Sequence, residues 1–284
     1  MRFTTEIAPL DLDQTLGCGQ TFRWRQQPDG SWLGPLEDCL IGLRQNGARL
    51  LIEARPSGSE RSAKRLVRTH LRAEDDVVKV QRVLARDPVL AAGIPRVTGL
   101  RIVKIDSWEC LCSFTLATYA NIPRISKMIE TLAQRFGHNI VEGVSAFPSL
   151  SELSRATVNE LSDCGLGYRA RYIHDLCRSV DSRKLRRMES LEYDDLRSEL
   201  MDLPGVGDKV ADCVALFGFG KLESFPIDVW IERALARLFR QRGSYTRLRE
   251  FAMDRWGPYA GYAQEYLYYN ERARAATGAC LFTE

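Results

Sequence analysis

A lysine and an aspartate, separated by a short stretch of chain, stand out as residues that could act together on a substrate. Lys209 follows the glycine-rich sequence LPGVGD, and Asp228 follows the sequence SFPI. A lysine in the first turn of a helix meets the positive end of the helix dipole, and partial burial also disfavours its charged form. A larger share of Lys209 would then be the neutral, nucleophilic amine, which contact with a phosphate alone would not require.

The glycine-rich turn before Lys209 has two interpretations. Pro204 ends one helix pattern, and Gly205 and Gly207 let the backbone turn tightly without a Cβ that would block a ligand. The unpaired N–H groups at the start of the next helix could bind a phosphate, a contact that reads no base sequence. Taken by itself, however, the pattern is somewhat more typical of a plain turn between two core helices.

The aspartate also has two interpretations. Asp228 comes directly before the apolar, helix-like run VWIERAL, after Pro226 has restricted the chain. Its carboxylate could cap that helix through the backbone N–H of Ile231 or a neighbour. It could instead face Lys209 and stabilise positive charge that develops on a sugar.

The elements that must position these residues fall into two regions, which predict an α+β fold. Within the first 95 or so residues, Asp29-Gly30 and Asn46-Gly47 each separate two alternating, strand-like runs and predict two hairpins of an antiparallel sheet. The pattern turns helical after about Ser59. We therefore predict an antiparallel β-sheet domain with terminal helices over residues 1–97 and a helical domain over residues 98–284. No low-complexity linker separates them, so we expect close packing.

Apolar spacing locates the main helices of the second region. One predicted helix has a single apolar face and stops at Gly137. Its apolar residues are Ile125, Met128, Ile129, Leu132 and Phe136. Further apolar faces flank the glycine-rich turn on both sides, so we place a hairpin between two helices at about residues 201–210.

Composition excludes several classes of protein. The formal net charge is only +3, so a nucleic-acid partner would need a local concentration of positive charge. No apolar run is long enough to span a bilayer, and the sequence MRFTTEIAPL lacks the apolar core of a signal peptide. We expect no membrane association and an intracellular location, in the cytoplasm or nucleoid of a prokaryote or the nucleus of a eukaryote.

The cysteines and histidines do not predict a metal site. The eight cysteines include no CxxC pair, and the three histidines stand far apart in the sequence. Zinc sites and iron-sulfur clusters need closely spaced thiolates or imidazoles. We expect free, mostly buried thiols of a reducing compartment, with no metal and no cofactor.

The sequence LPGVGDKVADC, followed by PIDVW, resembles the helix-hairpin-helix and Gly/Pro-Asp signature of the DNA base-excision glycosylases. The stretches CGQTFRW, ECLCSFTLATYANIPRI, CGLGYRARYI and WGPYAGYAQEYLYY narrow the resemblance to the 8-oxoguanine DNA glycosylase/AP lyase group. The resemblance runs from Cys18 to Tyr269. It implies an antiparallel β domain before two helical lobes, and a base flipped out of the duplex into the cleft between them. It also implies a monomer whose partner is double-stranded DNA containing oxidised guanine.

The resemblance assigns the chemistry to the first two residues considered. Lys209 would attack the sugar carbon C1′, expel the oxidised base and hold the sugar as a Schiff base, after which β-elimination nicks the strand. Asp228 would stabilise the cationic sugar. The positions expected to bind DNA phosphate are Gly205, Gly207 and Val210.

Four further residues would form the base pocket. The backbone carbonyl of Gly19 would accept a hydrogen bond from N7–H, a donor that 8-oxoguanine has and guanine lacks. Cys213 would form a wall, Gln264 would read the Watson–Crick edge, and Tyr268 would stack on the base, since their spacing puts Gln264 and Tyr268 on one helix face. Without the resemblance, Cys213 fits a core position equally well, Tyr268 a packed tyrosine cluster and Gln264 a solvated surface.

The side of the helix that loses its base would meet another group of residues. By the resemblance, Tyr168, Arg169 and Arg124 face or wedge beside the opposite base. Relatives from eukaryotes carry an asparagine that fills the gap left by the flipped base. This chain has Tyr119 at that position, with Asn121 two residues on, so either residue could fill the gap.

A second departure lies beside the aspartate. Relatives often carry a histidine that contacts a phosphate two residues after it, where this chain has Trp230. An indole donates only one hydrogen bond, so that phosphate contact is weakened or redirected. We therefore expect the preference for an opposite base to be less secure than the identity of the excised base.

Two alternative functions remain to be weighed. One is a glycosylase of the same superfamily for another base. Endonuclease III-like and adenine-specific members usually carry a C-terminal four-cysteine cluster, whereas this chain ends with the single Cys280, and purely hydrolytic alkylbase glycosylases lack the lysine at position 209. A non-catalytic DNA-binding module would have no reason to keep both Lys209 and Asp228. The basic residues at 183, 184, 186 and 187 precede the hairpin, and we interpret them as a solvated helix face rather than a DNA track.

Overall fold

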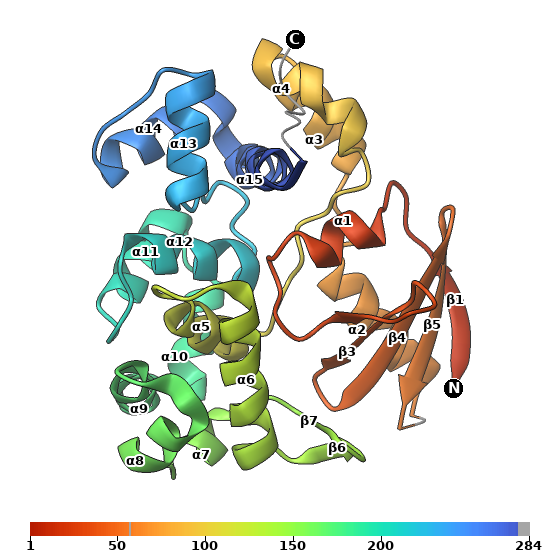
Figure 1. The fold of residues 1–284 in the computed structure, drawn as a ribbon, viewed down its shortest axis with the longest axis vertical. Helices are drawn as coiled ribbons and strands as arrows, with labels where there is room; N and C mark the ends of the chain where they lie inside the picture. The colour runs from red at the N-terminus through yellow and green to blue at the C-terminus, as the bar shows by residue number, and fades with distance from the viewer. Residues whose placement is uncertain (57, 278–284) are drawn as a thin grey trace.

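The N-terminal part of the protein is a five-stranded antiparallel sheet with the strand order β1-β5-β4-β3-β2 (Figure 1). The computed structural model describes residues 1–56 and 58–277. Both predicted hairpins are confirmed, because Gly30 and Gly47 have the positive φ angles that their turns require. The strands are β1 (Arg2–Glu6), β2 (Arg25–Gln26), β3 (Trp32–Leu36), β4 (Cys39–Asn46) and β5 (Arg49–Arg55).

Five short helical elements accompany the sheet. They are α1 (Leu12–Gly17), α2 (Glu60–His70), α3 (Val77–Leu84), α4 (Pro88–Gly93) and η1 (Ile94–Arg96). Ser59 caps α2, as the change of pattern near this residue predicted, and α2 lies behind the sheet in Figure 1. In contrast, α3 and α4 lie beside the C-terminal helix α15 (Ala260–Thr277), away from the sheet.

The remaining chain is almost entirely helical and forms two lobes (Figure 1). The first lobe contains α5 (Ser107–Leu116), α6 (Ile122–Phe136), α7 (Leu150–Leu153), α8 (Val158–Leu161), η2 (Ser162–Leu166), α9 (Arg169–Ser179), α10 (Ser182–Glu189), α11 (Tyr193–Met201), α12 (Asp208–Cys213) and η3 (Val214–Gly218). The second contains α13 (Val229–Leu238), α14 (Tyr245–Trp256), η4 (Gly257–Tyr259) and α15. One small hairpin of β6 (Asn139–Val141) and β7 (Val144–Ser145) interrupts the first lobe, where we had expected helix.

The predicted amphipathic helix is confirmed as α6, although its end has a different cause from the usual one. Gly137 follows α6 with a φ of −81°, which any residue can adopt. A Cβ at Gly137 would instead collide with the carbonyl oxygen of Ala146, at the end of β7. Glycine is therefore required here for a close approach of two backbone segments.

The two regions share one hydrophobic core, as the absence of a linker predicted. Gln81 of α3 donates a hydrogen bond of 3.0 Å to the Tyr266 hydroxyl of α15, and Asp87 accepts hydrogen bonds from Arg255 and Trp256. Helices that precede residue 97 thus pack into the second lobe. The domain boundary between residues 97 and 98 stays a prediction. It marks where the sequence pattern changes, and the packing shows no gap there.

Candidate active site

The turn between α11 and α12 needs its two glycines for different reasons. Gly205 has a φ of +77°, and a Cβ there would lie 2.7 Å from the ring of Tyr172. Gly207 has a φ of −100°, and a Cβ there would meet no atom within 4 Å. The turn conformation therefore requires Gly205, whereas glycine at 207 keeps open a space that a ligand could occupy.

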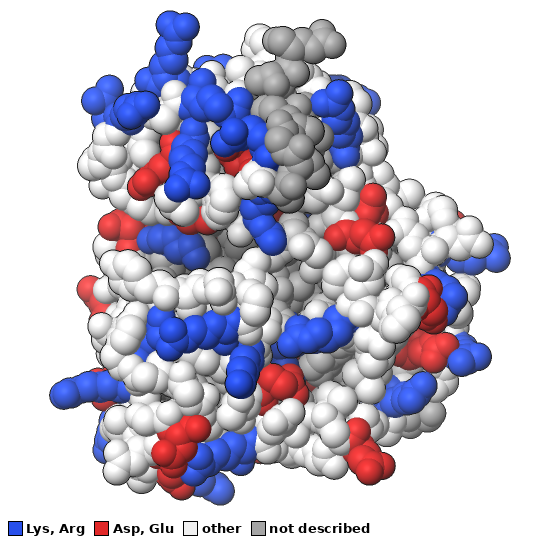
Figure 2. Space-filling model, viewed as in Figure 1, with Lys and Arg blue, Asp and Glu red and all other residues white. Residues whose placement is uncertain are grey.

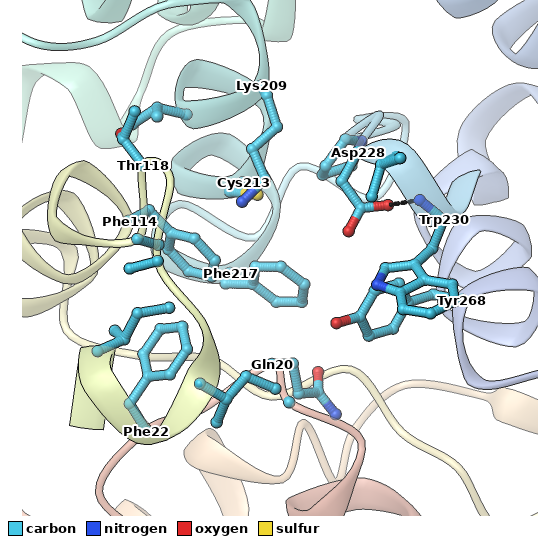
Figure 3. A pocket seen from close by; sticks show the side chains of 18 of the residues that line it. Gln20, Phe22, Phe114, Thr118, Lys209, Cys213, Phe217, Asp228, Trp230 and Tyr268 are labelled. Carbon is cyan, nitrogen blue, oxygen red and sulfur yellow. Dashed lines mark hydrogen bonds between the residues drawn. The ribbon is translucent and has the colours of Figure 1, made fainter. Parts of the chain in front are cut away.

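Lys209 extends from the first turn of α12 into a cleft of about 820 Å³ that both lobes line. Figure 3 shows its amine close to the thiol of Cys213, with Asp228 facing them from the other lobe. The amine also lies 5.2 Å from the centre of the Phe114 ring. The structure thus brings together the two residues that the sequence proposed for chemistry.

Asp228 caps α13 and also faces the cleft. One carboxylate oxygen accepts hydrogen bonds from the backbone N–H groups of Trp230 (2.9 Å) and Ile231 (3.0 Å), so that Asp228 caps α13. The other oxygen points into the cleft in Figure 3. Capping therefore holds the carboxylate in place opposite Lys209.

The four predicted base-pocket residues line the same cleft. Gly19 has a φ of +105°, a conformation that favours glycine, and a Cβ there would also have to displace the side-chain ends of Ile122 (2.7 Å) and Arg272 (2.8 Å). Gln264 is 5% exposed, and its side-chain oxygen has no hydrogen-bond partner among the described residues. A buried acceptor without a partner costs stability unless a ligand or water supplies a donor.

Burial decides the protonation of the cysteine in this pocket. It raises the pKa of Cys213 to about 12, although the neighbouring Lys209 favours the thiolate. Cys213 is therefore a neutral thiol in the wall of the cleft and not a nucleophile.

The sequence did not identify several other residues of the cleft. Its apolar side includes Phe22, Phe114 and Phe217 (Figure 3). On α15, Arg272 donates a hydrogen bond to the carbonyl of Cys18, beside Gly19, and lies 5.7 Å from the Tyr268 ring. The four-residue spacing of Gln264 and Tyr268, extended by one step along the helix, would have found Arg272.

A buried carboxyl group also lies in this wall. Glu265 is 2% exposed and accepts a hydrogen bond of 3.5 Å from the Cys18 thiol. Burial is the main reason that the pKa of Glu265 is raised to about 7; the charge of Asp228 acts in the same direction, while the Cys18 hydrogen bond and the charge of Arg272 act against it. No spacing rule distinguishes this glutamate in the sequence, because its burial depends on the distant Cys18 segment.

The residues expected to face the opposite base occupy different environments. Tyr119 is 93% exposed and Tyr168 is 54% exposed, and Arg124 is also exposed, on the first turn of α6. Asn121 caps α6, since its side-chain oxygen accepts a hydrogen bond of 3.0 Å from the Arg124 N–H. Its oxygen is therefore held toward the helix, and its N–H groups are the part of the amide that this bond leaves available.

Arg169 does not lie where we expected it. Its side chain is 2% exposed, and its guanidinium donates to the backbone carbonyls of Thr118 and Tyr119. An arginine whose donors are bound to backbone carbonyls cannot present them to a base without breaking those bonds. The geometry therefore does not support direct contact of Arg169 with an opposite base.

Two family models together match nearly the whole chain. Residues 2–111 match the N-terminal domain of 8-oxoguanine DNA glycosylase. Residues 114–258 match the HhH-GPD superfamily of base excision DNA repair proteins. The chain belongs to the HhH-GPD superfamily. The predicted fold class, with an antiparallel sheet before the helical HhH-GPD domain, is confirmed.

Relatives of similar length carry related names. The chain is 30% identical to the probable N-glycosylase/DNA lyase of Methanothermobacter thermautotrophicus, and the matched region covers 94% of this chain and 95% of the relative. It is also 30% identical to the N-glycosylase/DNA lyase OGG1 of Arabidopsis thaliana, over 92% of this chain and 77% of the relative.

A solved structure of this superfamily is similar throughout. The 8-oxoguanine glycosylase/lyase of Clostridium acetobutylicum, in complex with double-stranded DNA containing cytosine opposite 8-oxoguanine, is 27% identical. It superposes with a TM-score of 0.89 and covers 97% of this chain and 98% of that chain.

The described residues include no candidate metal cluster and no membrane-spanning helix. Among residues 1–56 and 58–277, no group of three metal-binding side chains could hold an ion, and no helix is long and apolar enough to cross a membrane.

The charged side chains of the surface are mixed in sign. Figure 2 shows basic and acidic side chains interspersed over the face of the molecule viewed in Figure 1. On α10, Arg187 pairs with Glu199, while Arg183 and Arg186 are exposed. Cys280 lies outside the described residues.

Proposed function

We propose that this protein is a bifunctional DNA glycosylase and AP lyase that excises 8-oxoguanine from duplex DNA and then nicks the strand. The observation that carries the proposal is the cleft in which Lys209 and Asp228 face each other beside Gly19 and Gln264. The names of the full-length relatives support the same activity. The proposed enzyme works inside the cell, as a monomer on double-stranded DNA and without a cofactor.

Lys209 is the proposed nucleophile. Its neutral amine forms a bond to C1′ as the bond from C1′ to the base breaks, and the base leaves with the electron pair of that bond and takes up a proton. Opening of the sugar ring gives a Schiff base between the lysine and C1′. Loss of a proton from C2′ then expels the 3′ phosphate by β-elimination, which cuts the strand.

Asp228 supplies negative charge where the sugar becomes cationic. Because its carboxylate is fixed by the two N–H groups that it caps, little reorganisation is needed when that charge develops. Removing one such preorganised group typically slows an enzyme by about 10²- to 10³-fold.

Discrimination of the base follows from the acceptors of the pocket. The Gly19 carbonyl would accept from N7–H of 8-oxoguanine, whereas guanine would place a lone pair against it and leave both acceptors unpaired. The unpartnered oxygen of Gln264 would accept from N–H groups on the Watson–Crick edge, while the ring of Tyr268 stacks on the base. Gly205, Gly207 and Val210 are the proposed contacts to DNA phosphate.

Borohydride trapping on a duplex with a single 8-oxoguanine tests the proposal. We expect a covalent protein–DNA adduct with the native chain, and none with Lys209→Gln, which should still bind the duplex. An undamaged duplex is the control for both proteins. Equal trapping of Lys209→Gln would mean that another residue is the nucleophile.

A further inference from the structure

The loop between α5 and α6 holds an aromatic side chain away from the protein at the edge of the cleft. Tyr119 is 93% exposed and has a φ of +51°, a left-handed conformation that is uncommon for a large side chain. A bulky residue keeps such a conformation only when its surroundings fix it. The cause must therefore lie in the contacts of the loop backbone.

Arg169 makes those contacts from beneath the surface. Its Nε donates a hydrogen bond of 2.9 Å to the Thr118 carbonyl, and one terminal nitrogen donates to the same carbonyl and to that of Tyr119, the latter at 3.2 Å. Its guanidinium also lies 4.4 Å from the ring of Tyr168, whose hydroxyl donates to the Thr118 carbonyl at 3.3 Å. One buried arginine thus holds the backbone carbonyl of Tyr119 and lies against the ring of Tyr168, whose hydroxyl shares the Thr118 carbonyl with it.

The two tyrosines adjoin the proposed phosphate-binding turn. Tyr119, Tyr168 and Tyr172 line a shallow groove together with Gly205 and Gly207. The rings of Tyr168 and Tyr172 meet edge to face with their centres 6.0 Å apart. A strand held by its phosphates at the glycines would have its neighbouring base steps over these rings, which can replace lost base stacking.

Hydrogen-bond readout of the opposite base is correspondingly poor on this face. Asn121, the alternative residue for the gap, holds its side-chain oxygen toward α6 as a cap and keeps only its amide N–H groups for a base, and the Nε and one terminal nitrogen of Arg169 are already bound to carbonyls. Among the five residues predicted for this face, Arg124 is the only charged group that remains exposed. Stacking on an aromatic ring tolerates any base, because every base has a π-face.

We infer that Arg169 is a positioning residue that holds Tyr119 as an aromatic wedge, and that this wedge accepts the base opposite the lesion by stacking rather than by reading its identity. The inference rests on the proposed function, because it assumes that DNA with an extruded nucleotide binds at this cleft. It assigns Arg169 a role through Tyr119 and not through contact with DNA.

A binding assay that needs no chemistry tests the wedge. The probe is a duplex with a tetrahydrofuran abasic analogue opposite 2-aminopurine, whose fluorescence reports stacking on Tyr119. We expect Tyr119→Ala to weaken binding by roughly 10- to 100-fold and to abolish the fluorescence change, as expected for one lost base–aromatic stack. Val78→Ala is the control, because Val78 is an exposed apolar side chain on α3 that does not line the groove, and it should change neither the affinity nor the fluorescence.

A double-mutant cycle then tests the link to Arg169. Arg169→Gln should also weaken binding. The double variant Tyr119→Ala/Arg169→Gln should bind within about threefold of Tyr119→Ala, because both substitutions remove the same positioned ring of Tyr119. Independent, multiplicative effects would overturn the inference. Arg169→Lys, with thermal unfolding of each variant, separates positioning from a loss of folding, because a folding defect would not depend on Tyr119.

The opposite base decides the second half of the inference. With cytosine, adenine, guanine or thymine opposite the analogue, we expect affinities of the native chain within about tenfold of each other. A preference for one base above 100-fold that Arg169→Gln removes in the Tyr119→Ala background would show that Arg169 reads the base. Because binding is measured without excision, a native chain that binds in this way but excises no 8-oxoguanine would contradict only the proposed activity.

Discussion

Replacement of Asp228 by asparagine or by alanine should separate its two roles. Its carboxylate caps α13 through Trp230 and Ile231 and also faces Lys209. Asparagine keeps a side-chain oxygen for the cap but removes the negative charge, whereas alanine removes both. The pair of variants therefore distinguishes the charge from the cap.

The expected magnitudes follow from these contacts. A carboxylate about 4 Å from a unit positive charge at an effective dielectric constant of about 20 contributes roughly 4 kcal/mol, a factor of about 10³ in rate. Asp228 is only half-buried, so we expect base excision by Asp228→Asn to slow by about 10²- to 10³-fold. Loss of the cap in Asp228→Ala should lower the free energy of unfolding by about 1 kcal/mol more than in Asp228→Asn.

Single-turnover release of 8-oxoguanine measures the rate, and denaturant unfolding measures stability. Asp208→Asn is the matched control, because Asp208 also lines the cleft but pairs with Arg197 on the same side as Lys209. We expect the control to excise the base within about tenfold of the native rate. A native excision rate in Asp228→Asn would refute the electrostatic role, and equal unfolding free energies of the two Asp228 variants would refute the separate cap.

Three further predictions follow from the turn, from the buried glutamate and from the basic helix. Gly205→Ala should destabilise the turn and lower affinity for every duplex, whereas Gly207→Ala should unfold like the native chain and lose affinity alone, as parallel unfolding and binding titrations would show. The pKa of Glu265, raised by burial from 4.5 to about 7, means that the folded state holds this proton more tightly than the unfolded state. That contribution is complete below pH 4.5 and is lost as pH rises through about 7, so Glu265→Gln should remove a decline of roughly 3 kcal/mol in unfolding free energy over this interval. Replacing both Arg183 and Arg186 by glutamine should change the slope of log K against log salt for DNA binding by less than about 0.9, the value for one phosphate contact. A larger change would show that this helix contacts DNA.

Local sequence signals predicted those elements whose cause is local. The Asp29-Gly30 and Asn46-Gly47 turns need positive φ angles, and α6 needs an apolar face, so both kinds of element could be read from neighbouring residues. Strand β1 was missed, because it forms only by pairing with β5 across most of the N-terminal domain. The packing of α3 and α4 on α15 was missed for the same reason, since no short-range pattern reports contacts between the two ends of a chain.

The same distinction applies to the site. Lys209 and Asp228 could be proposed from the sequence, because their neighbours identify the helix starts on which they lie. The environment of Arg169 could not, since its burial depends on where the carbonyls of Thr118 and Tyr119 lie after folding. Glu265 is a similar case, because only the folded Cys18 segment excludes water from it.

A buried hydrogen-bond network connects the two lobes that carry Lys209 and Asp228. Asp212, one turn after Lys209, is fully buried and accepts hydrogen bonds from the hydroxyls of Tyr193 on α11 (2.5 Å) and Tyr245 on α14 (2.6 Å) and from Arg197 (3.1 Å). Burial raises the pKa of Asp212, while these hydrogen bonds and the charge of Arg197 lower it. Because Tyr245 lies on the other lobe, a movement that widened the cleft here would break its hydrogen bond to Asp212 and leave one oxygen of the buried carboxylate without that donor, at a cost of about 1–3 kcal/mol. This hydrogen bond favours a cleft that is preformed at this point, so the proposed function requires the DNA, and not the cleft, to deform before a sugar reaches Lys209.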